Sequence, residues 1–150
     1  MKPRPLEDYS AAKKYVLAAL CKQSLCSSQI RQRLKRREVP PEMIEDLIEE
    51  VTRLGFVDDK LWVESFVRRQ QARHDGPMTI KYKLRSKGVE NVLIDDLVPQ
   101  DESLQLEQIQ GLLKGRYRKF DLNDYKQRQK AVAALARKGF SLDIILQACS

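Results

Sequence analysis

Histidine, cysteine, glycine and proline are scarce in this chain of 150 residues. It has one histidine and three cysteines, and no two cysteines have the spacing of a zinc site. A structural metal site is therefore not expected. Six glycines and six prolines in a chain that is 42% hydrophobic leave a composition dominated by good helix formers, which argues against a β-sandwich or a β-barrel. We expect an all-α fold.

Long hydrophobic segments are also missing. No stretch approaches the roughly 20 apolar residues of a membrane-spanning helix. Met1 to Pro5 contain charge and proline in place of the apolar core of a signal peptide. We therefore expect a cytoplasmic protein that contacts no membrane. Cys21 and Cys149 lie among apolar residues, so both are predicted to pack as small hydrophobic side chains in a reducing compartment.

The sequence contains none of the common catalytic patterns. It has no glycine-rich phosphate loop, no nucleophile elbow and no cluster of histidine, cysteine and carboxylate residues. Asp58 and Asp59 are adjacent acids, but such a pair is expected to cap the start of a helix. His74, followed by Asp75, is interpreted as the polar end of a helix. We expect no catalytic residue, no cofactor and no metal, and therefore no enzyme.

The chain repeats itself three times. Leu34, Leu84 and Leu135 recur at spacings of 50 and 51 residues, and apolar residues lie at the same offsets around each of these anchors. Such a period indicates a tandem array of helical units that bury surface against their neighbours. We expect three three-helix repeats stacked into an elongated, curved array. The predicted division is an N-terminal extension over residues 1–9, then repeats over residues 10–56, 57–100 and 101–150.

Helix start and stop signals agree with this division. Ser10 and Ser27 are predicted to cap the first two helices, and Pro41 is predicted to begin the third as a first-turn proline. Gly55 occupies the position that a helix C-terminus prefers. The short junction around Gly88 requires the flanking helices of the second repeat to pack as close neighbours.

Positive charge is in excess and unevenly placed. The chain has 28 lysines and arginines against 21 acids, a net charge of +7. Basic residues concentrate in the middle helix of each repeat, whereas the third helices of the first two repeats are acidic. Aligned middle helices would form a basic stripe that binds phosphates with strong salt dependence and little sequence preference. The alternative is a set of solvated helix faces balanced by the acidic neighbours.

Aromatic residues give the nucleic-acid interpretation little support. Trp62, Phe66 and Tyr117 fall on apolar helical faces and are predicted to lie in the core. Only Tyr82 and Tyr125 lie near basic residues and are expected to point outward, where they could stack on bases.

The ordered pattern of glycines, aromatics and basic residues resembles the RecX family of regulatory proteins of bacterial recombination. The resemblance spans about residues 10 to 149. It is carried by Gly55-Phe56-Val57-Asp58-Asp59, Phe66, Arg68, Arg69, Gly76-Pro77, Ile80, Leu84, Lys87-Gly88-Val89, Lys130 to Leu135, Arg137 to Ser141 and Ile144-Ile145.

The resemblance implies a non-enzymatic modulator of the RecA recombinase in DNA repair, homologous recombination and the SOS response. Such a protein binds the RecA filament on single-stranded DNA, lies in its helical groove and usually represses ATPase activity, filament extension and strand exchange. The expected partners are the RecA filament, single-stranded DNA and, more weakly, duplex DNA, with the chain acting as a monomer.

The cations expected to contact the filament or its DNA are called here the cationic set. The cationic set consists of Arg31, Arg33, Arg37, Arg68, Arg69, Lys81, Arg85, Lys87, Arg118, Lys126, Arg128, Arg137 and Lys138. The alternative function is a stand-alone helical DNA-binding protein of low sequence specificity. A duplex reader would need base-reading side chains on the helices after the glycine turns, but these helices are acidic or apolar. A pure scaffold would explain the repeats but not the segregated charge.

Overall fold

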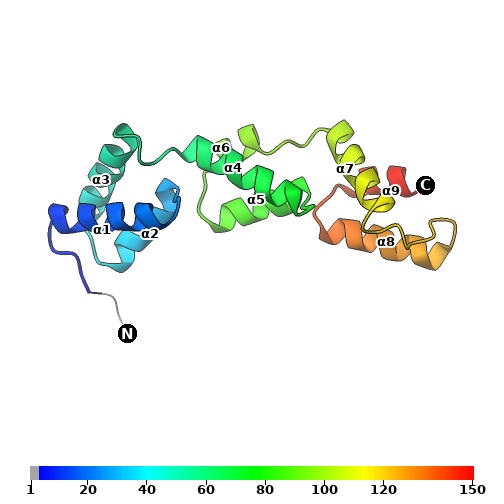
Figure 1. Cartoon of the computed structure of the whole chain (residues 1–150), viewed down its shortest axis with the longest axis horizontal. Helices are drawn as coiled ribbons and strands as arrows, with labels where there is room; N and C mark the ends of the chain where they lie inside the picture. Colours follow the sequence, from blue (N-terminus) through cyan, green and yellow to red (C-terminus); the bar gives the residue numbers. More distant parts are fainter. Residues whose placement is uncertain (1–3) are drawn as a thin grey trace. The chain divides into compact units, whose positions relative to one another are not determined.

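The computed structural model describes residues 4–150, which form nine α-helices and no strand (Figure 1). The all-α prediction is confirmed, and the helices follow one another in three sets of three. In chain order they are α1 (Tyr9–Lys22), α2 (Ser27–Arg36), α3 (Pro41–Arg53), α4 (Asp59–Ala72), α5 (Pro77–Ser86), α6 (Asn91–Leu97), α7 (Glu102–Lys114), α8 (Tyr125–Arg137) and α9 (Leu142–Cys149).

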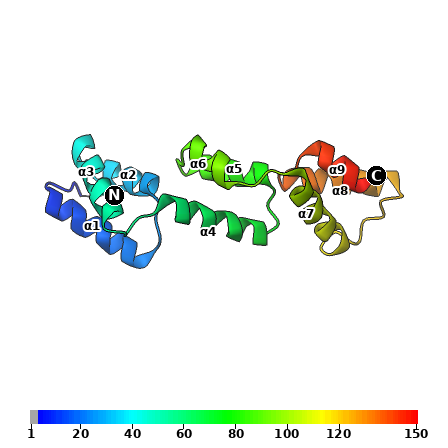
Figure 2. The same cartoon turned by 90° about the horizontal axis from the view of Figure 1, so that it is seen from above.

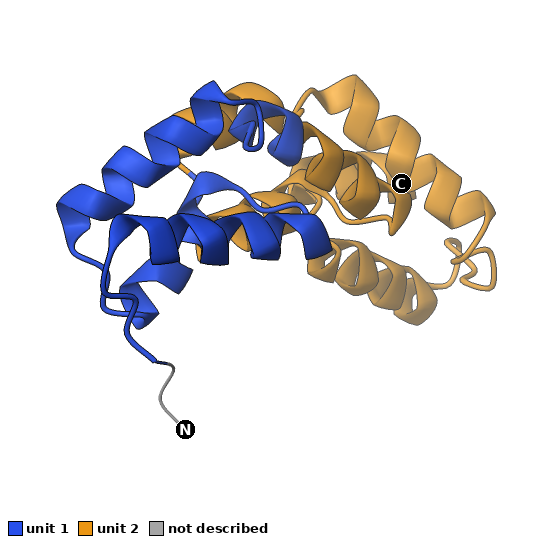
Figure 3. Ribbon diagram, turned by 60° about the vertical axis from the view of Figure 1, so that its left-hand side comes forward, with its two compact units in different colours: residues 1–63, 87–89 blue, residues 64–86, 90–150 orange. Residues whose placement is uncertain are grey.

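The chain divides into two compact units, coloured blue and orange in Figure 3. Unit 1 consists of residues 1–63 and 87–89, and unit 2 consists of residues 64–86 and 90–150. The division therefore falls inside α4, after Val63. The boundaries of the four predicted segments are retained as a proposal.

The predicted helix starts are partly wrong. Asp8, not Ser10, caps α1, because its carboxylate Oδ1 accepts a hydrogen bond from the Ala11 amide at 2.7 Å. Helix α2 begins at Ser27 itself, and the Ser27 hydroxyl and amide both donate to the carboxylate of Asp59. The first-turn proline of α3, Pro41, is confirmed.

Each repeat buries the anchor leucine that revealed the period. Leu34, Leu84 and Leu135 are all fully buried. Burying a leucine side chain contributes about 1.5 to 3 kcal/mol, so these positions tolerate only a similar apolar residue. The apolar residues at helical spacing therefore form the buried faces of the helices, as the periodicity predicted.

The core of unit 1 forms where α3 packs against both α1 and α2. Its fully buried side chains include Ala12, Ile30, Leu34, Leu47 and Val51. In unit 2, α9 packs against both α7 and α8, and these three helices lie together in both views (Figures 1 and 2).

The predicted burial of aromatic residues and cysteines is confirmed at some positions and wrong at others. Trp62 and Phe66 are buried as predicted, whereas Tyr117 is only half-buried, against the core of unit 2. Cys149 is buried as predicted. The prediction for Cys21 is wrong, because its side chain is exposed. On α1 the buried face passes through Val16, and residue 21 lies about 140° away from that face at 100° per residue.

A polar contact ties α1 to α3 within unit 1. Lys13 Nζ lies 2.6 Å from Glu50 Oε1, and the Tyr9 hydroxyl donates to the other oxygen of the same carboxylate. The hydrogen bond from Lys13, followed by that from Tyr9, lowers the pKa of Glu50 below its ordinary value. The same contact raises the pKa of Tyr9 to about 12. The pair therefore stabilises unit 1 where Glu50 is ionised and Tyr9 is protonated.

The turn between α8 and α9 packs against the start of α5 through the backbone. The Gly76 amide donates to the Lys138 carbonyl at 2.6 Å, and the Met78 amide donates to the Gly139 carbonyl at 3.0 Å. Gly139 has a φ of 98°, and a Cβ there would lie 2.5 Å from the Thr79 amide nitrogen. We call this contact the glycine joint. It requires glycine at residue 139 both for its backbone angle and for its space.

Replacing Gly139 by alanine should therefore cost much more stability than replacing Gly55. Gly55 also has a positive φ, of 85°, but a Cβ there would meet nothing within 4 Å. We expect Gly55→Ala to cost about 1 kcal/mol from backbone strain alone. Gly139→Ala should cost about 3 kcal/mol or more, because overpacking adds to strain. Urea unfolding monitored by circular dichroism measures the stability of both variants. Equal losses of stability would contradict the close packing at the glycine joint.

Candidate nucleic-acid interface

Arg31 on α2 pairs with an acid on the next helix. Its Nε donates to Glu45 Oε1 at 2.7 Å and its Nη2 donates to Glu45 Oε2 at 3.2 Å. This two-point contact is the geometry that favours arginine for carboxylates and phosphates alike. The hydrogen bonds from Arg31 lower the pKa of Glu45. Part of the predicted basic face of α2 is therefore balanced by α3 of the same repeat.

The second repeat has the same arrangement between α5 and α6. Lys81 Nζ lies 3.3 Å from Asp95 Oδ1, and Arg85 Nε donates to Asn91 Oδ1 at 3.3 Å. The two ion pairs occupy matching positions, three residues before and eleven residues after the anchor leucine. The Arg31 side chain is 33% exposed and its pair contributes at most about 1 kcal/mol, so Arg31 can exchange its carboxylate for a phosphate, whereas the Lys81 side chain is only 12% exposed.

Other members of the cationic set lie on exposed surface of α4 and α8. Arg68 and Arg69 are exposed near the end of α4, and Lys126 and Arg137 are exposed on α8. Within residues 4–150 no carboxylate lies within ion-pair distance of Arg68, Lys126 or Arg137. Of the whole set, these cations are the most open to an anionic partner.

Three cations of the set lie over aromatic rings, and one of them is Arg69, whose guanidinium lies 5.9 Å from the centre of the Phe66 ring. The Arg128 guanidinium lies 5.9 Å from the centre of the Tyr125 ring, and that of Arg37 lies 4.8 Å from the centre of the Tyr15 ring. Tyr125 and Tyr82 are 66% and 71% exposed, which confirms that both point outward. Arg128 and Tyr125 thus offer a charge and a flat ring at one place on α8.

The remaining members of the cationic set are held by local contacts or lie half-buried. Arg118 donates to the Gly115 carbonyl at 3.0 Å, and Arg33 is half-buried on α2. The Lys87 carbonyl accepts a hydrogen bond from the Ser28 hydroxyl at 2.8 Å within unit 1. Unit 1 holds Arg31, Arg33, Arg37 and Lys87, and unit 2 holds the other nine.

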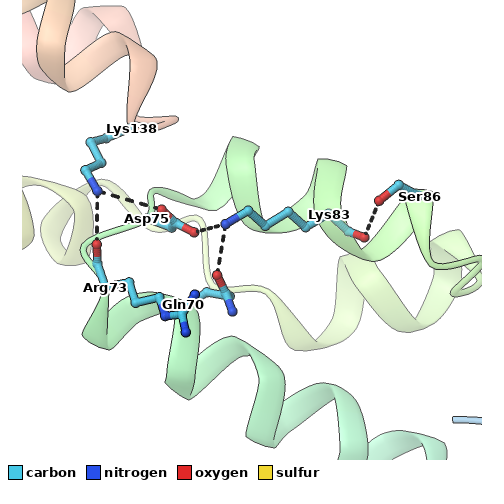
Figure 4. A network of polar contacts seen from close by, with 6 residues as sticks. All are labelled: Gln70, Arg73, Asp75, Lys83, Ser86 and Lys138. Atoms are coloured by element: carbon cyan, nitrogen blue, oxygen red, sulfur yellow. Dashed lines mark hydrogen bonds and ion pairs between the residues drawn. The ribbon is translucent and has the colours of Figure 1, made fainter. Parts of the chain in front are cut away.

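Lys138 belongs to a partly buried polar network that the sequence did not reveal (Figure 4). Its ammonium donates to the Arg73 carbonyl at 3.0 Å and lies 4.0 Å from Asp75 Oδ1. The other oxygen of Asp75 accepts from Lys83 Nζ at 2.7 Å, and Lys83 also donates to Gln70 Oε1 at 3.0 Å. The network links α4, α5 and the turn after α8.

Asp75 is the centre of this network and is only 8% exposed. The sequence predicts only a polar helix end at Asp75, because a single aspartate beside a glycine and a proline is typical of a turn. Its structural role depends on contacts with residues 8 and 63 positions later in the chain. No local sequence pattern indicates such contacts. Lys138 therefore supports the glycine joint with its side chain as well as with its backbone.

The described part of the chain, residues 4–150, contains neither a metal cluster nor a membrane-spanning helix. No group of three or more histidine, cysteine, aspartate or glutamate side chains is placed to hold a metal ion in that part of the chain. None of the helices there combines the length and the apolar character needed to cross a membrane.

Removing the charge of Asp75 should destabilise unit 2. Asp75→Asn keeps the shape of the side chain but leaves Lys83 without its carboxylate, at an expected cost of about 1 to 3 kcal/mol. Asp95→Asn is the matched control, because its carboxylate is 64% exposed and its loss should cost less than about 1 kcal/mol. Urea unfolding compares the two variants, and similar small losses would contradict a structural role for Asp75.

Family models and relatives agree on what the chain is similar to. The model described as the second three-helix domain of RecX matches residues 58–97, and the third three-helix domain of RecX matches residues 103–149. A "Regulatory protein RecX" of Streptococcus equi subsp. zooepidemicus is 26% identical over 91% of this chain and 53% of its own length. One from Streptococcus pyogenes serotype M2 is 29% identical over 90% and 53%. The chain thus spans about half the length of these curated relatives.

Solved structures also indicate similarity to RecX proteins. The crystal structure of RecX from Lactobacillus salivarius matches with a TM-score of 0.81 and 26% identity, over 93% of both chains. A crystal structure of regulatory protein RecX matches with a TM-score of 0.75 and 28% identity, over 93% of this chain and 70% of the other. These matches cover all three sets of helices described above. The chain belongs to the RecX family.

Proposed function

We propose that this chain binds the RecA filament on single-stranded DNA and represses its ATPase activity, filament extension and strand exchange. It would act as a monomer in the cytoplasm, without a cofactor and without catalysis of its own. The observation that carries the proposal is the likeness, over nine tenths of the chain, to proteins named regulatory protein RecX.

The placement of charge supports a filament as the target. Exposed cations without a carboxylate partner in the described part of the chain, such as Arg68 and Arg137, suit phosphates or acidic protein surface. A cation already paired with an exposed acid, such as Arg31, can change partners at little cost. Such contacts weaken as salt rises, because each phosphate neutralised releases counterions.

Repression follows from binding the assembled state better than its parts. Cationic residues occur in both units of the chain, so several neighbouring subunits of a filament could be contacted at once. A ligand shifts an equilibrium only by its difference in affinity between two states. A chain that bridges adjacent subunits favours the filament conformation to which it binds and hinders the cycling that ATP hydrolysis requires.

One observation favours a second candidate, a stand-alone DNA-binding protein of low sequence specificity. Tyr125 and Arg128 place an exposed ring beside a cation on α8, which is the combination that single-strand binders use. The experiment below separates the two candidates.

The affinity for RecA-coated single-stranded DNA should exceed the affinity for bare single-stranded DNA by about tenfold or more. Cys21 is the exposed cysteine, while Cys26 and Cys149 are buried, so a maleimide dye should label residue 21 selectively. Fluorescence anisotropy of the labelled chain is measured against bare single-stranded DNA, free RecA and RecA-coated DNA at two salt concentrations. We expect tight binding to coated DNA alone, together with falling ATPase activity. Equal affinity for bare DNA with unchanged ATPase activity would favour the second candidate and contradict the first.

Reversing two charges on α8 tests whether this helix contacts the filament, and a matched double variant elsewhere is the control. Lys126→Glu with Arg137→Glu should weaken binding to coated DNA by about tenfold or more and reduce the salt dependence. Lys22→Glu with Lys60→Glu changes the net charge equally, at exposed residues outside the cationic set, and should leave binding within about twofold of the parent. Equal effects of both double variants would show that only net charge matters.

A further inference from the structure

Helices α8 and α9 border a groove of about 260 Å³ in unit 2. The residues that line it are Arg128, Gln129, Val132, Leu146, Cys149 and Ser150. Helices α8 and α9 pack against each other, so the two walls of the groove are held by the same core that contains Leu135 and Ile145.

The apolar residues of this groove replace an ion pair. In the first two repeats, the positions three residues before and eleven residues after the anchor leucine hold Arg31 with Glu45 and Lys81 with Asp95. In the third repeat, the same positions relative to Leu135 are Val132 and Leu146. A charge pair spans the surface between the second and third helices in the first two repeats. In the third repeat that surface is apolar.

Leu146 is the apolar lining residue that faces water most, because Val132 is half-buried and Cys149 is 2% exposed, and exposed Leu142 lies beside the groove. Leu146 is 49% exposed and Leu142, one turn earlier on α9, is 55% exposed. Cys149 forms part of the apolar wall, and burial raises the pKa of its thiol. Contiguous exposed apolar surface is a feature of sites that bind a partner.

The charges on the α8 side of the groove are all positive. Helix α8 carries Lys126, Arg128, Lys130 and Arg137 and contains no acid. Arg128 lines the groove itself and is steadied by the Tyr125 ring. Across the groove, α9 carries a single acid, Asp143. An occupant that complements this site has apolar side chains for the floor and carboxylates for the α8 edge.

We propose that the groove between α8 and α9 docks an acidic protein segment that carries apolar side chains, with Val132 and Leu146 receiving the apolar groups and Arg128 a carboxylate. The inference rests on the proposed function, in which the segment belongs to the protein part of the filament. DNA fits the groove less well, because phosphates gain nothing from exposed leucines. A second copy of this chain also fits poorly, because its acidic helix α3 buries its apolar face in unit 1, including Ile44 and Leu47.

The test restores the ion pair of the other two repeats. Val132→Lys with Leu146→Asp leaves the net charge unchanged and uses a pair that this fold already accommodates at Lys81 and Asp95. Anisotropy of the full chain is measured against RecA-coated DNA and bare single-stranded DNA. We expect the double variant to bind coated DNA at least about tenfold more weakly, as for loss of a buried anchor, and to bind bare DNA within about twofold of the parent.

Controls separate docking from folding and from general surface effects. Leu146→Gln alone changes one exposed side chain and should give part of the loss, while circular dichroism confirms the fold of each variant. Val92→Asp removes an apolar side chain that is 70% exposed on α6, and should leave binding to coated DNA unchanged.

The outcomes distinguish the two proposals. A parent chain that does not bind coated DNA overturns the proposed function. A parent that binds coated DNA, together with a double variant that binds it equally well, overturns the groove proposal alone. Equal loss of bare-DNA binding would assign the groove to nucleic acid and would also overturn it.

Discussion

The backbone contact at the glycine joint is the constraint on which unit 2 depends. The Lys138 and Gly139 carbonyls accept hydrogen bonds from Gly76 and Met78, and this approach is possible only because residues 76 and 139 both lack a Cβ. Unit 1 contains a related contact, in which the Ser28 hydroxyl donates to the Lys87 carbonyl. In both units the start of a middle helix meets the turn before the third helix of the following repeat. Tandem three-helix repeats are therefore joined through the polar backbone of a turn as well as through apolar side chains.

The joint also determines which cations are available to a partner. Lys138 contributes its carbonyl to the joint and its ammonium to the Asp75 network, so its charge is committed inside unit 2. Arg137, one residue earlier, is exposed and without a carboxylate partner in the described part of the chain. Adjacent basic residues in a sequence can thus have different functions, one holding the fold and one available for binding. Three of the proposed filament contacts, Lys126, Arg128 and Arg137, and one wall of the proposed groove lie on α8, the helix that leads into this turn.

The sequence predicted the fold well because its main signal is repeated three times. A period of 50 and 51 residues located the anchor leucines, and each is fully buried. Local details were predicted less well, because they depend on competition between neighbouring groups. Asp8 rather than Ser10 caps α1, and Cys21 lies on the exposed side of an otherwise apolar segment. For the site, the sequence named the basic residues, but it could not reveal that Glu45 and Asp95 neutralise two of them or that Asp75 is buried, since these contacts join residues distant in the chain.

Hydrogen exchange at the Gly76 and Met78 amides tests the joint most directly. Both amides donate to the turn after α8, so they should exchange only when unit 2 opens. We predict exchange slower by roughly a thousandfold or more than in an unstructured peptide, close to the slowest amides of α8. Gly139→Ala should accelerate exchange at both amides. Rapid exchange of Gly76 and Met78 in the parent chain, while the α8 amides remain protected, would contradict the account.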